Sequence, residues 1–237
     1  MPRTQAYLEF RMALLMPLEL MRQEHQHIPD PPPPSQQNIV RGLRGGAAVL
    51  MVAAFEAFLD DMAVERIGEV QTYTPPIVFN KLPIALQEQN VFETLERALK
   101  GPKYQPAGTR ASRIPAIRTA STWVSTDQLN PIAFGDTSGN PGKKAVPDLF
   151  KCFGFTDLFN TIRPRFENKW KAPVMPDFLG DKLDEIVQRR HRVAHRADAL
   201  TISRTDLRES ERFLRILAEV LDIELGYHIR AICRKAR

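Results

Sequence analysis

The residues from 47 to 59 form a run that is apolar on almost every side of a helix, and Glu56 is its one acidic member. A helix of that kind has to be buried on most sides, by partner helices or by a second subunit. The run lies within the longest helical pattern of the chain, 36–70. The sequence therefore predicts a central helix around which the rest of the chain is arranged.

Amphipathic helices are also predicted near both ends of the chain. Residues 4–27 carry a broad apolar face, and Pro17 predicts a kink within them because proline lacks the N–H of a helical residue. Residues 205–232 carry apolar side chains at helical spacing, and Ser203 or Thr205 is a suitable N-cap. These helices are the expected partners of the central one.

Proline residues interrupt two further parts of the chain. The segment 29–35 is a proline run, which forbids helix and predicts an extended linker. The segment 71–177 predicts a long, irregular, proline-rich insertion between the core helices. Within it, helical pieces are expected at 84–100, 110–129 and parts of 147–160, turns at 130–144, and irregular structure at 163–177. The insertion is either a connection on a helical core or a segment that faces the substrate.

Strand signals are weak everywhere, so we expect an all-α fold in a single domain over 1–237. The hydrophobic content of 43% and the charged content of 26% are ordinary for a soluble globular chain. No stretch approaches the roughly 20 apolar residues of a membrane-spanning helix, and the start of the chain has no apolar run of secretory type. We therefore expect a cytoplasmic protein without a membrane segment.

The net charge of +5 and the isoelectric point near 9.4 permit an anionic partner such as RNA or DNA, but solubility alone also explains them. Cys152 and Cys233 provide neither a disulfide framework nor metal-ligand spacing. Reduced thiols are the simpler expectation for both.

The segment 189–196 concentrates four arginines and two histidines in eight residues. The residues before it place apolar side chains at helical spacing, and Arg190 falls where the next apolar residue of that stripe is due. A guanidinium on a packing face needs a charged partner or a place at a dimer seam. The segment is therefore a candidate site and not only a solvated helix face.

Arg190 and His195 provide the groups that RNA cleavage without a metal requires. In that reaction the 2′-hydroxyl attacks the adjacent phosphorus, with a base or an acid to move protons and a cation on the non-bridging oxygens. Imidazole suits the first role and guanidinium the second. His191 lies four residues before His195 and hence on the same helix face. It is a second candidate for proton transfer or for positioning the phosphate.

Arg189, Arg192 and Arg196 are expected to add phosphate contacts without sequence specificity. Composition alone favours a simpler interpretation, in which the segment is a solvated or RNA-contacting basic helix. The spacing is also unspecific, because Arg22 and His27 repeat it directly before the proline linker. We interpret that second copy as chance.

Other chemistries lack parts in this sequence. A zinc site at His191 and His195 has neither the HExxH pattern nor a third ligand, so we expect no metal and no cofactor. Ser-His-Asp catalysis lacks a nucleophile elbow. His228, alone on the last predicted helix, is expected to be structural.

The segment Arg190-His191-x-x-x-His195, between the last two long helices, resembles the R-x4-6-H motif of the HEPN superfamily (higher eukaryotes and prokaryotes nucleotide-binding). The pair Phe55-Glu56 is similar to one that the early core helix of that family often carries. The residues after the motif resemble the RiboL-PSP type of HEPN domain. The resemblance covers 36–70 and 178–235, whereas 71–177 matches nothing.

The resemblance implies an up-and-down helical bundle that forms a homodimer. The two motifs would face each other across a cleft and cleave RNA without a metal, leaving a 2′,3′-cyclic phosphate and a 5′-hydroxyl. Arg190 and His195 would be the essential pair, with His191 in support, and Glu56 would hold a motif arginine by a buried ion pair. Such domains occur in toxin–antitoxin modules and anti-phage systems, which implies a cognate antitoxin or another defence protein as a partner.

The leading hypothesis is accordingly a homodimeric, metal-independent endoribonuclease of toxin or anti-phage defence type. The alternative is a non-catalytic helical module that binds RNA or a protein partner, in which the basic helix only contacts phosphate. A third interpretation is a structural oligomerisation domain with Arg190 at the dimer seam.

Overall fold

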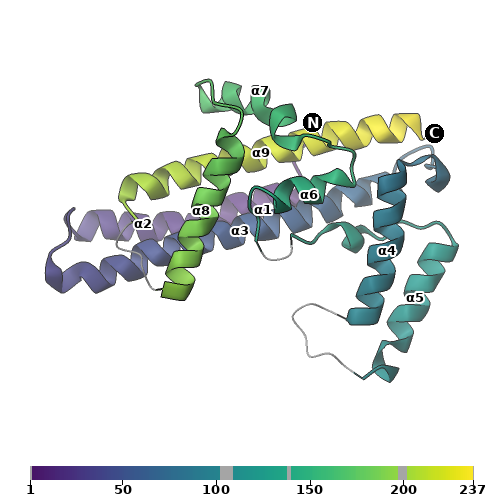
Figure 1. Ribbon diagram of the computed structural model, residues 1–237, viewed down its shortest axis with the longest axis horizontal. Helices are drawn as coiled ribbons and strands as arrows, with labels where there is room; N and C mark the ends of the chain where they lie inside the picture. The colour runs from purple at the N-terminus through teal and green to yellow at the C-terminus, as the bar shows by residue number, and fades with distance from the viewer. Residues whose placement is uncertain (1, 102–108, 138–139, 197–201, 237) are drawn as a thin grey trace.

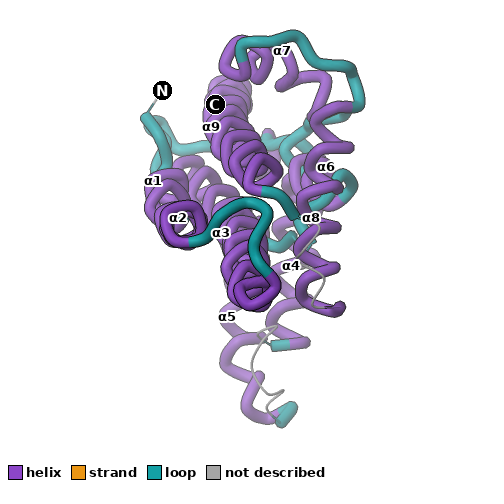
Figure 2. The backbone as a smooth tube through the Cα atoms, turned by 90° about the vertical axis from the view of Figure 1, so that its left-hand side faces the viewer, coloured by secondary structure: helices purple, strands orange, loops and turns teal. Residues whose placement is uncertain are grey.

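A computed structural model describes residues 2–101, 109–137, 140–196 and 202–236, with the backbone alone at 194–196. Across those residues the secondary structure is α-helix with short 3-10 segments and no strand, as Figures 1 and 2 show. The predicted all-α fold is confirmed. The helices are α1 (Gln5–Ala13), α2 (Leu15–His27), α3 (Gln37–Gln71), α4 (Ile84–Lys100), α5 (Ile114–Ser125), α6 (Ala145–Lys151), α7 (Leu158–Trp170), α8 (Phe178–Arg196) and α9 (Arg204–Lys235). In the described ranges, none combines enough length with enough apolar content to cross a membrane.

Helix α3 is the centre of the bundle, as its apolar run predicts. It packs against α1, α2, α8 and α9, and Phe55, Leu59 and Met62 along it are fully buried. Figure 1 shows α3 and α9 side by side along the long axis, with α8 crossing them. The apolar run of α3 is therefore covered by helices on most sides, and Ala53 and Ala57 in it stay exposed.

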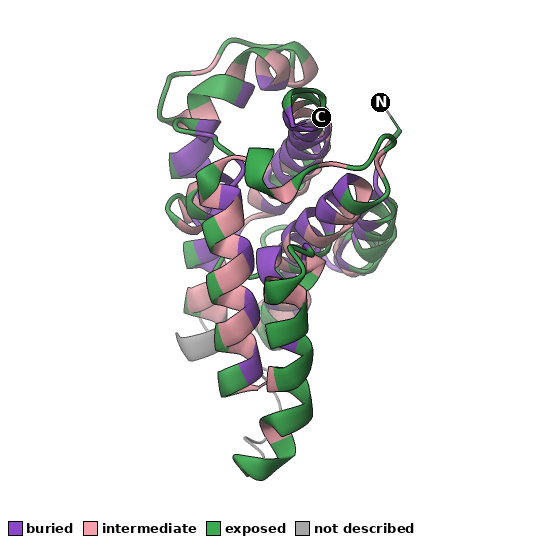
Figure 3. Ribbon diagram, turned by 90° about the vertical axis from the view of Figure 1, so that its right-hand side faces the viewer, coloured by how far each residue is buried: buried purple, intermediate pink, exposed green. Residues whose placement is uncertain are grey.

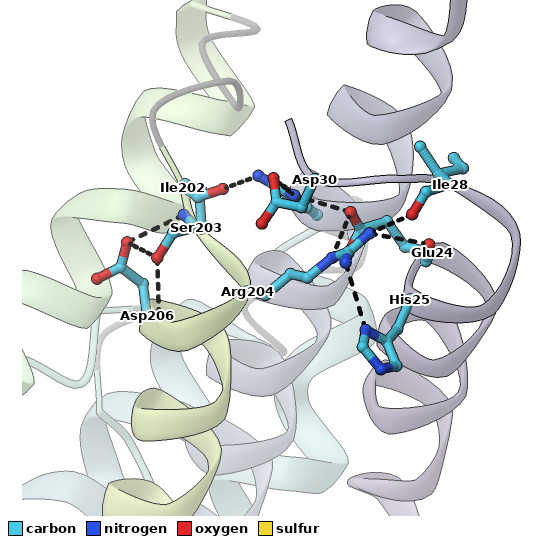
Figure 4. A network of polar contacts seen from close by, with 9 residues as sticks. Glu24, His25, Ile28, Asp30, Ile202, Ser203, Arg204 and Asp206 are labelled. Carbon is cyan, nitrogen blue, oxygen red and sulfur yellow. Dashed lines mark hydrogen bonds and ion pairs between the residues drawn. The ribbon is translucent and has the colours of Figure 1, made fainter. Parts of the chain in front are cut away.

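A buried carboxylate ties three helices together at one end of the bundle (Figure 4). Glu24, near the end of α2, is only 1% exposed. It accepts hydrogen bonds from Arg44 Nη2 on α3 at 2.8 Å and from Arg204 Nε on α9 at 2.9 Å. Arg44 Nη1 also donates to the carbonyl of Ile202 at 2.9 Å. The starts of α3 and α9 therefore lie together, and these two helices run in the same direction while α2 runs against them.

A second buried pair lies further along the same helices. Arg66 on α3 and Asp222 on α9 are 1% and 0% exposed, and Arg66 Nη2 lies 2.7 Å from Asp222 Oδ1. The backbone N–H of Thr4, which caps α1, donates to Asp222 Oδ2 at 3.3 Å. This carboxylate thus joins α1, α3 and α9.

The first predicted helix is divided in two. α1 ends at Ala13 and α2 begins at Leu15. Pro17 lacks the N–H that would bond to the carbonyl of Ala13, which explains why the break falls here. After α2, the chain bends at Asp30 and Pro31 and forms no helix before a 3-10 turn over Pro34–Gln36.

The segment 71–177 is more helical than its prolines suggest. α4 has the predicted bounds, and α5 follows a 3-10 turn and ends four residues before the predicted limit of 129. Figures 1 and 3 show α4 and α5 projecting from the bundle as a pair. A further 3-10 segment, η4 (Pro131–Phe134), packs against both α3 and α4. The projecting pair is therefore attached to α3 through η4, which packs against both α3 and α4.

The irregular structure predicted for 163–177 is wrong over its first half, because α7 continues to Trp170 with Pro164 inside it. The reason is tertiary packing. Phe166 is fully buried, with its ring 5.6 Å from that of Trp170 and 5.5 Å from that of Phe213 on α9. Burial of these aromatic rings against α9 outweighs the local cost of the proline.

The Arg66–Asp222 pair generates a prediction about stability. Arg66→Met removes the cation and leaves a buried, unpaired carboxylate, which costs about 3–5 kcal/mol of unfolding free energy. The double variant Arg66→Met with Asp222→Leu removes both charges and is expected to recover most of that loss. Urea denaturation of the two variants and the parent protein measures the difference. Equal losses in the single and the double variant would contradict this account.

Candidate functional site

Helix α8 carries the arginine- and histidine-rich segment. Leu179, Leu183, Ile186 and Val187 are buried along it, and α8 packs against α3. Its hydrophobic face predicts this packing, and the chain after Arg196 leads into α9. The orientation of 189–196 is therefore set by how α8 is fixed between α3 and α9.

Arg189 occupies the packed position that the sequence pattern gives to Arg190. It is 8% exposed, with Nη2 at 3.0 Å from Asp206 Oδ1 and Nη1 at 3.0 Å from Ser210 Oγ, both on α9. It also pairs with Glu185, one turn earlier on α8. The expectation that Arg189 contacts phosphate is corrected, because its guanidinium is bound by carboxylates and a hydroxyl within the protein.

Asp206 connects the two helices and caps one of them. Its Oδ2 accepts from Ser203 N at 2.9 Å and from Ser203 Oγ at 2.7 Å, while Ser203 Oγ accepts from Asp206 N, which completes a capping box at the start of α9. Burial raises the pKa of Asp206, but the hydrogen bonds from Ser203 and the charge of Arg189 outweigh it and lower that pKa below its usual value. Asp206 is thus an anion that holds Arg189 in place.

The next residues of the segment lie nearer the surface. Arg190 and His191 are half-buried and Arg192 is exposed. His191 Nε2 lies 3.1 Å from Asn140 Oδ1. Because an amide oxygen only accepts, this contact places the proton of the imidazole on Nε2.

The backbone of His195 and Arg196 forms the last turn of α8, but their side chains lie outside the described part of the structure. The helical backbone keeps His191 and His195 one turn apart, as their spacing predicts. Their pairing with Arg190 stays a prediction.

Glu56 does not hold a motif arginine among the described side chains. It is half-buried on α3, and the carboxylates that pair with Arg189 are those of Glu185 and Asp206. The sequence could not distinguish these acids, because Glu185 and Asp206 lie in polar patterns whose orientation depends on how α8 and α9 pack.

The turn-rich segment of the insertion lies against α8. Lys143 N donates to Asp184 Oδ1 at 2.6 Å, and Lys143 Nζ lies 2.7 Å from Asp181 Oδ1. A Cβ at Gly142 would approach Asp184 Oδ1 to 2.7 Å, so a larger residue there would require the Asp184 side chain to move. The turn-rich segment is therefore held against α8 through Lys143.

A groove of about 910 Å³ separates this segment from α8 and α4. Its lining includes three carboxamides, those of Gln89, Asn140 and Gln188, together with charged and apolar side chains. Asn140 links the groove to His191. Sequence reasoning missed this groove, and the only local signal for it was the run of turn residues that ends at Gly142.

Cys152, at the edge of the groove, is a poor nucleophile. Burial raises the pKa of its thiol to about 12, so it stays protonated at neutral pH. Within the described ranges, no three His, Cys, Asp or Glu side chains gather as a metal site would require.

The other copy of the spacing lies on α2. Arg22 is exposed and pairs with Glu19 at 2.5 Å, and His27 is exposed at the end of the helix. The buried residue between them is Glu24, whose carboxylate binds Arg44 within the bundle. His228 lies against Phe155, with 4.5 Å between the ring centroids and 38° between the ring planes.

Asp60 lies beneath the segment that borders the groove. Its Oδ1 accepts from Thr137 N at 2.9 Å. Burial, with smaller contributions from the nearby charges of Asp136 and Glu56, outweighs the hydrogen bonds from Thr137 and raises the pKa of Asp60 to about 6. Ionised Asp60 is therefore a source of instability in the folded protein at neutral pH.

The sequence model of the RiboL-PSP-HEPN family matches residues 18–227. The match spans α3, α8 and most of α9, and its range also includes 71–177. No curated protein and no solved structure gives a match.

The two neighbouring arginines are expected to respond differently to substitution. Arg189→Met leaves Asp206 and Ser210 without their partner and costs about 1–3 kcal/mol, less than in a fully dry site because the carboxylates are partly exposed. Arg190→Met costs about 0.5 kcal/mol or less, as for most surface positions. Thermal and urea unfolding of both variants measures the difference. A greater loss for Arg190→Met would show that the packed position is misassigned.

The pKa of Asp60 predicts how stability depends on pH. The folded protein binds the proton more tightly than the unfolded chain, so this group lowers the unfolding free energy as the pH rises from about 4 to about 6. Asp60→Asn keeps an acceptor for Thr137 N and removes the charge. It is expected to raise the unfolding free energy at pH 7.5 by roughly 1–2 kcal/mol, after allowance for solvent screening, and to leave it unchanged at pH 4. Urea unfolding at the two pH values tests this, and a gain of the same size at both would refute it.

Proposed function

Because the chain belongs to the RiboL-PSP-HEPN family, whose HEPN-type domain is associated with ribonucleases and RNA-binding modules, we propose that it is a metal-independent endoribonuclease. The observation that carries the proposal is the anchoring of α8. Buried Arg189 is bound to Asp206 and Ser210, and the next three residues of the motif segment lie nearer the surface. Arg190 and His191 are thereby half-buried on a packed helix and not on a mobile tail.

Arg190 is the motif arginine in this proposal, and Arg189 is its structural support. The guanidinium of Arg189 is bound by Asp206, Glu185 and Ser210, so it has little capacity left for a phosphate. Arg190 forms no hydrogen bond or ion pair with the described side chains. Its five N–H donors can therefore hold the non-bridging oxygens of a phosphodiester.

The proposed reaction is an internal transfer at phosphorus. The 2′-oxygen forms a bond to the phosphorus while the bond from phosphorus to the 5′-oxygen breaks. A base accepts the proton of the 2′-hydroxyl and an acid protonates the leaving 5′-oxygen, which leaves a 2′,3′-cyclic phosphate and a 5′-hydroxyl. His195 takes one of these roles, and His191, with its proton on Nε2, assists it or positions the phosphate.

The remaining parts of the proposal concern assembly and setting. Two copies of the motif in a homodimer would provide a composite site, with Arg192 and Arg196 in contact with the RNA backbone. The proposal also includes a role in toxin–antitoxin or anti-phage defence, a cytoplasmic location and a cognate antitoxin as partner. Membership of the family supports these parts, and the basic segment is compatible with an RNA partner.

The test is RNA cleavage in the presence of EDTA. Arg190→Ala and His195→Ala are each expected to lower the rate at least about 100-fold, as loss of a proton-transfer group or of a charge-stabilising group does. Arg22→Ala and His27→Ala provide matched controls, because they remove the same residue types at the same spacing on α2. These controls are expected to cleave like the parent protein.

The RNA products and the oligomeric state of the variants distinguish between the alternatives. Products that end in a 2′,3′-cyclic phosphate support the proposed reaction, whereas loss of cleavage in EDTA contradicts it. RNA binding by the parent protein without any cleavage indicates the non-catalytic RNA-binding module. Monomerisation of Arg190→Ala in size-exclusion chromatography would indicate the structural role at a dimer seam.

A further inference from the structure

We infer that the groove between α8 and the insertion binds a nucleobase that is turned out of the RNA strand beside the scissile phosphate. This inference rests on the proposed function and deepens it, because it gives cleavage a base preference. The argument depends on the position of the groove, on its charge and on its hydrogen-bonding groups.

The groove lies directly beside the candidate site. Gln188 on α8 lines it, and Gln188 is one turn before His191. From the other side, Asn140 lines the groove and accepts from His191 Nε2 at 3.1 Å. A nucleotide whose phosphate lies over Arg190 and His191 can therefore place its base between these two amides.

The charge of the lining favours a neutral group over a phosphate. Lys143, Lys144 and Lys151 line the groove, and so do three carboxylates, those of Asp136, Asp148 and Asp184. Within this set Lys151 pairs with Asp148, and Asp184 is bound by the backbone of Lys143. Equal numbers of cations and anions give no net attraction for a phosphate. The excess positive charge lies instead on the arginine segment of α8.

The hydrogen-bonding groups suit the edge of a base. Gln89, Asn140 and Gln188 each carry a carboxamide, which both donates and accepts. Gln89 is held in place by its Nε2, which donates to the carbonyl of Ala133 at 3.1 Å. Amide side chains of this kind hydrogen-bond the edges of unstacked bases in sequence-specific RNA recognition.

The size and floor of the groove also fit this ligand. About 910 Å³ is near the upper end of the range of small-molecule sites, so a base with its ribose has room. Pro147 is half-buried in the lining and offers apolar surface that a flat ring can pack against, and the lining also includes the buried Phe134 and Leu149. The combination of an apolar floor with amides at the edge is typical of a site for an uncharged aromatic heterocycle.

Cleavage of a random-sequence RNA tests the base preference. Sequencing of the cleaved ends is expected to show a bias at one position next to the cut. Gln188→Leu removes one reading amide and is expected to reduce that bias about tenfold, the equivalent of one or two hydrogen bonds. Gln26→Leu, an exposed glutamine on α2, is the matched control and is expected to keep the bias. Cleavage by Gln188→Leu with the bias of the parent protein would overturn the inference and leave the proposed function intact.

Binding of nucleosides tests the groove without cleavage. In NMR titrations with the four ribonucleosides, the side-chain amide signals of Gln89, Asn140 and Gln188 are expected to shift, and inorganic phosphate is expected to shift the signals of Arg190 and Arg192. Phosphate that shifts the groove amides while no nucleoside does so, up to its solubility limit, overturns the inference. Nucleoside binding by a protein that cleaves no RNA would reject the proposed nuclease but retain the groove as a nucleobase site.

Discussion

The carboxylate of Asp206 is the interaction on which the geometry of the candidate site depends. It caps α9 through Ser203 and binds Arg189 of α8, so one anion fixes both the start of one helix and the rotation of the other. An α-helix turns by about 100° per residue, so fixing Arg189 against α9 also fixes the directions of Arg190, His191 and Arg192. The basic character of the segment is therefore less informative than this single contact of buried Arg189 with Asp206.

Among the described residues, three buried arginines tie helices of the bundle together. Arg44 binds Glu24, Arg66 binds Asp222 and Arg189 binds Asp206, and in each case the carboxylate belongs to a different helix from the arginine. Such pairs carry a desolvation cost, and their value lies as much in fixing which surfaces meet as in net stability. In an arginine-rich chain, an arginine without such a partner, such as Arg190 among the described side chains, is the more informative candidate for function.

Patterns among neighbouring residues predicted the long helices, but they failed for features that depend on packing between helices. The bounds of α3 and α4 follow from apolar periodicity, and Ser203 caps α9 as its side chain suggests, because these signals lie within a few residues of one another. The helical form of α7 depends on contacts with α9, which no local pattern contains. The choice between Arg189 and Arg190 failed for the same reason: both lie at the edge of the apolar stripe, and only the position of Asp206 on α9 separates them. Lys143 and Asp184 both line the groove and are 41 residues apart in the chain, so no motif spacing could predict it.

The insertion changes what the basic helix can do in the proposed function. Arginines along α8 contact phosphates, which every RNA presents, so they favour binding without choosing a sequence. Sequence is read only where base edges meet fixed donors and acceptors, and the described part of α8 has no such set by itself. The insertion supplies these groups by laying Asn140 and Gly142 against α8, while Gln89 projects from α4. A chain with the same α8 and a shorter insertion would keep the chemistry and lose the means to select a base.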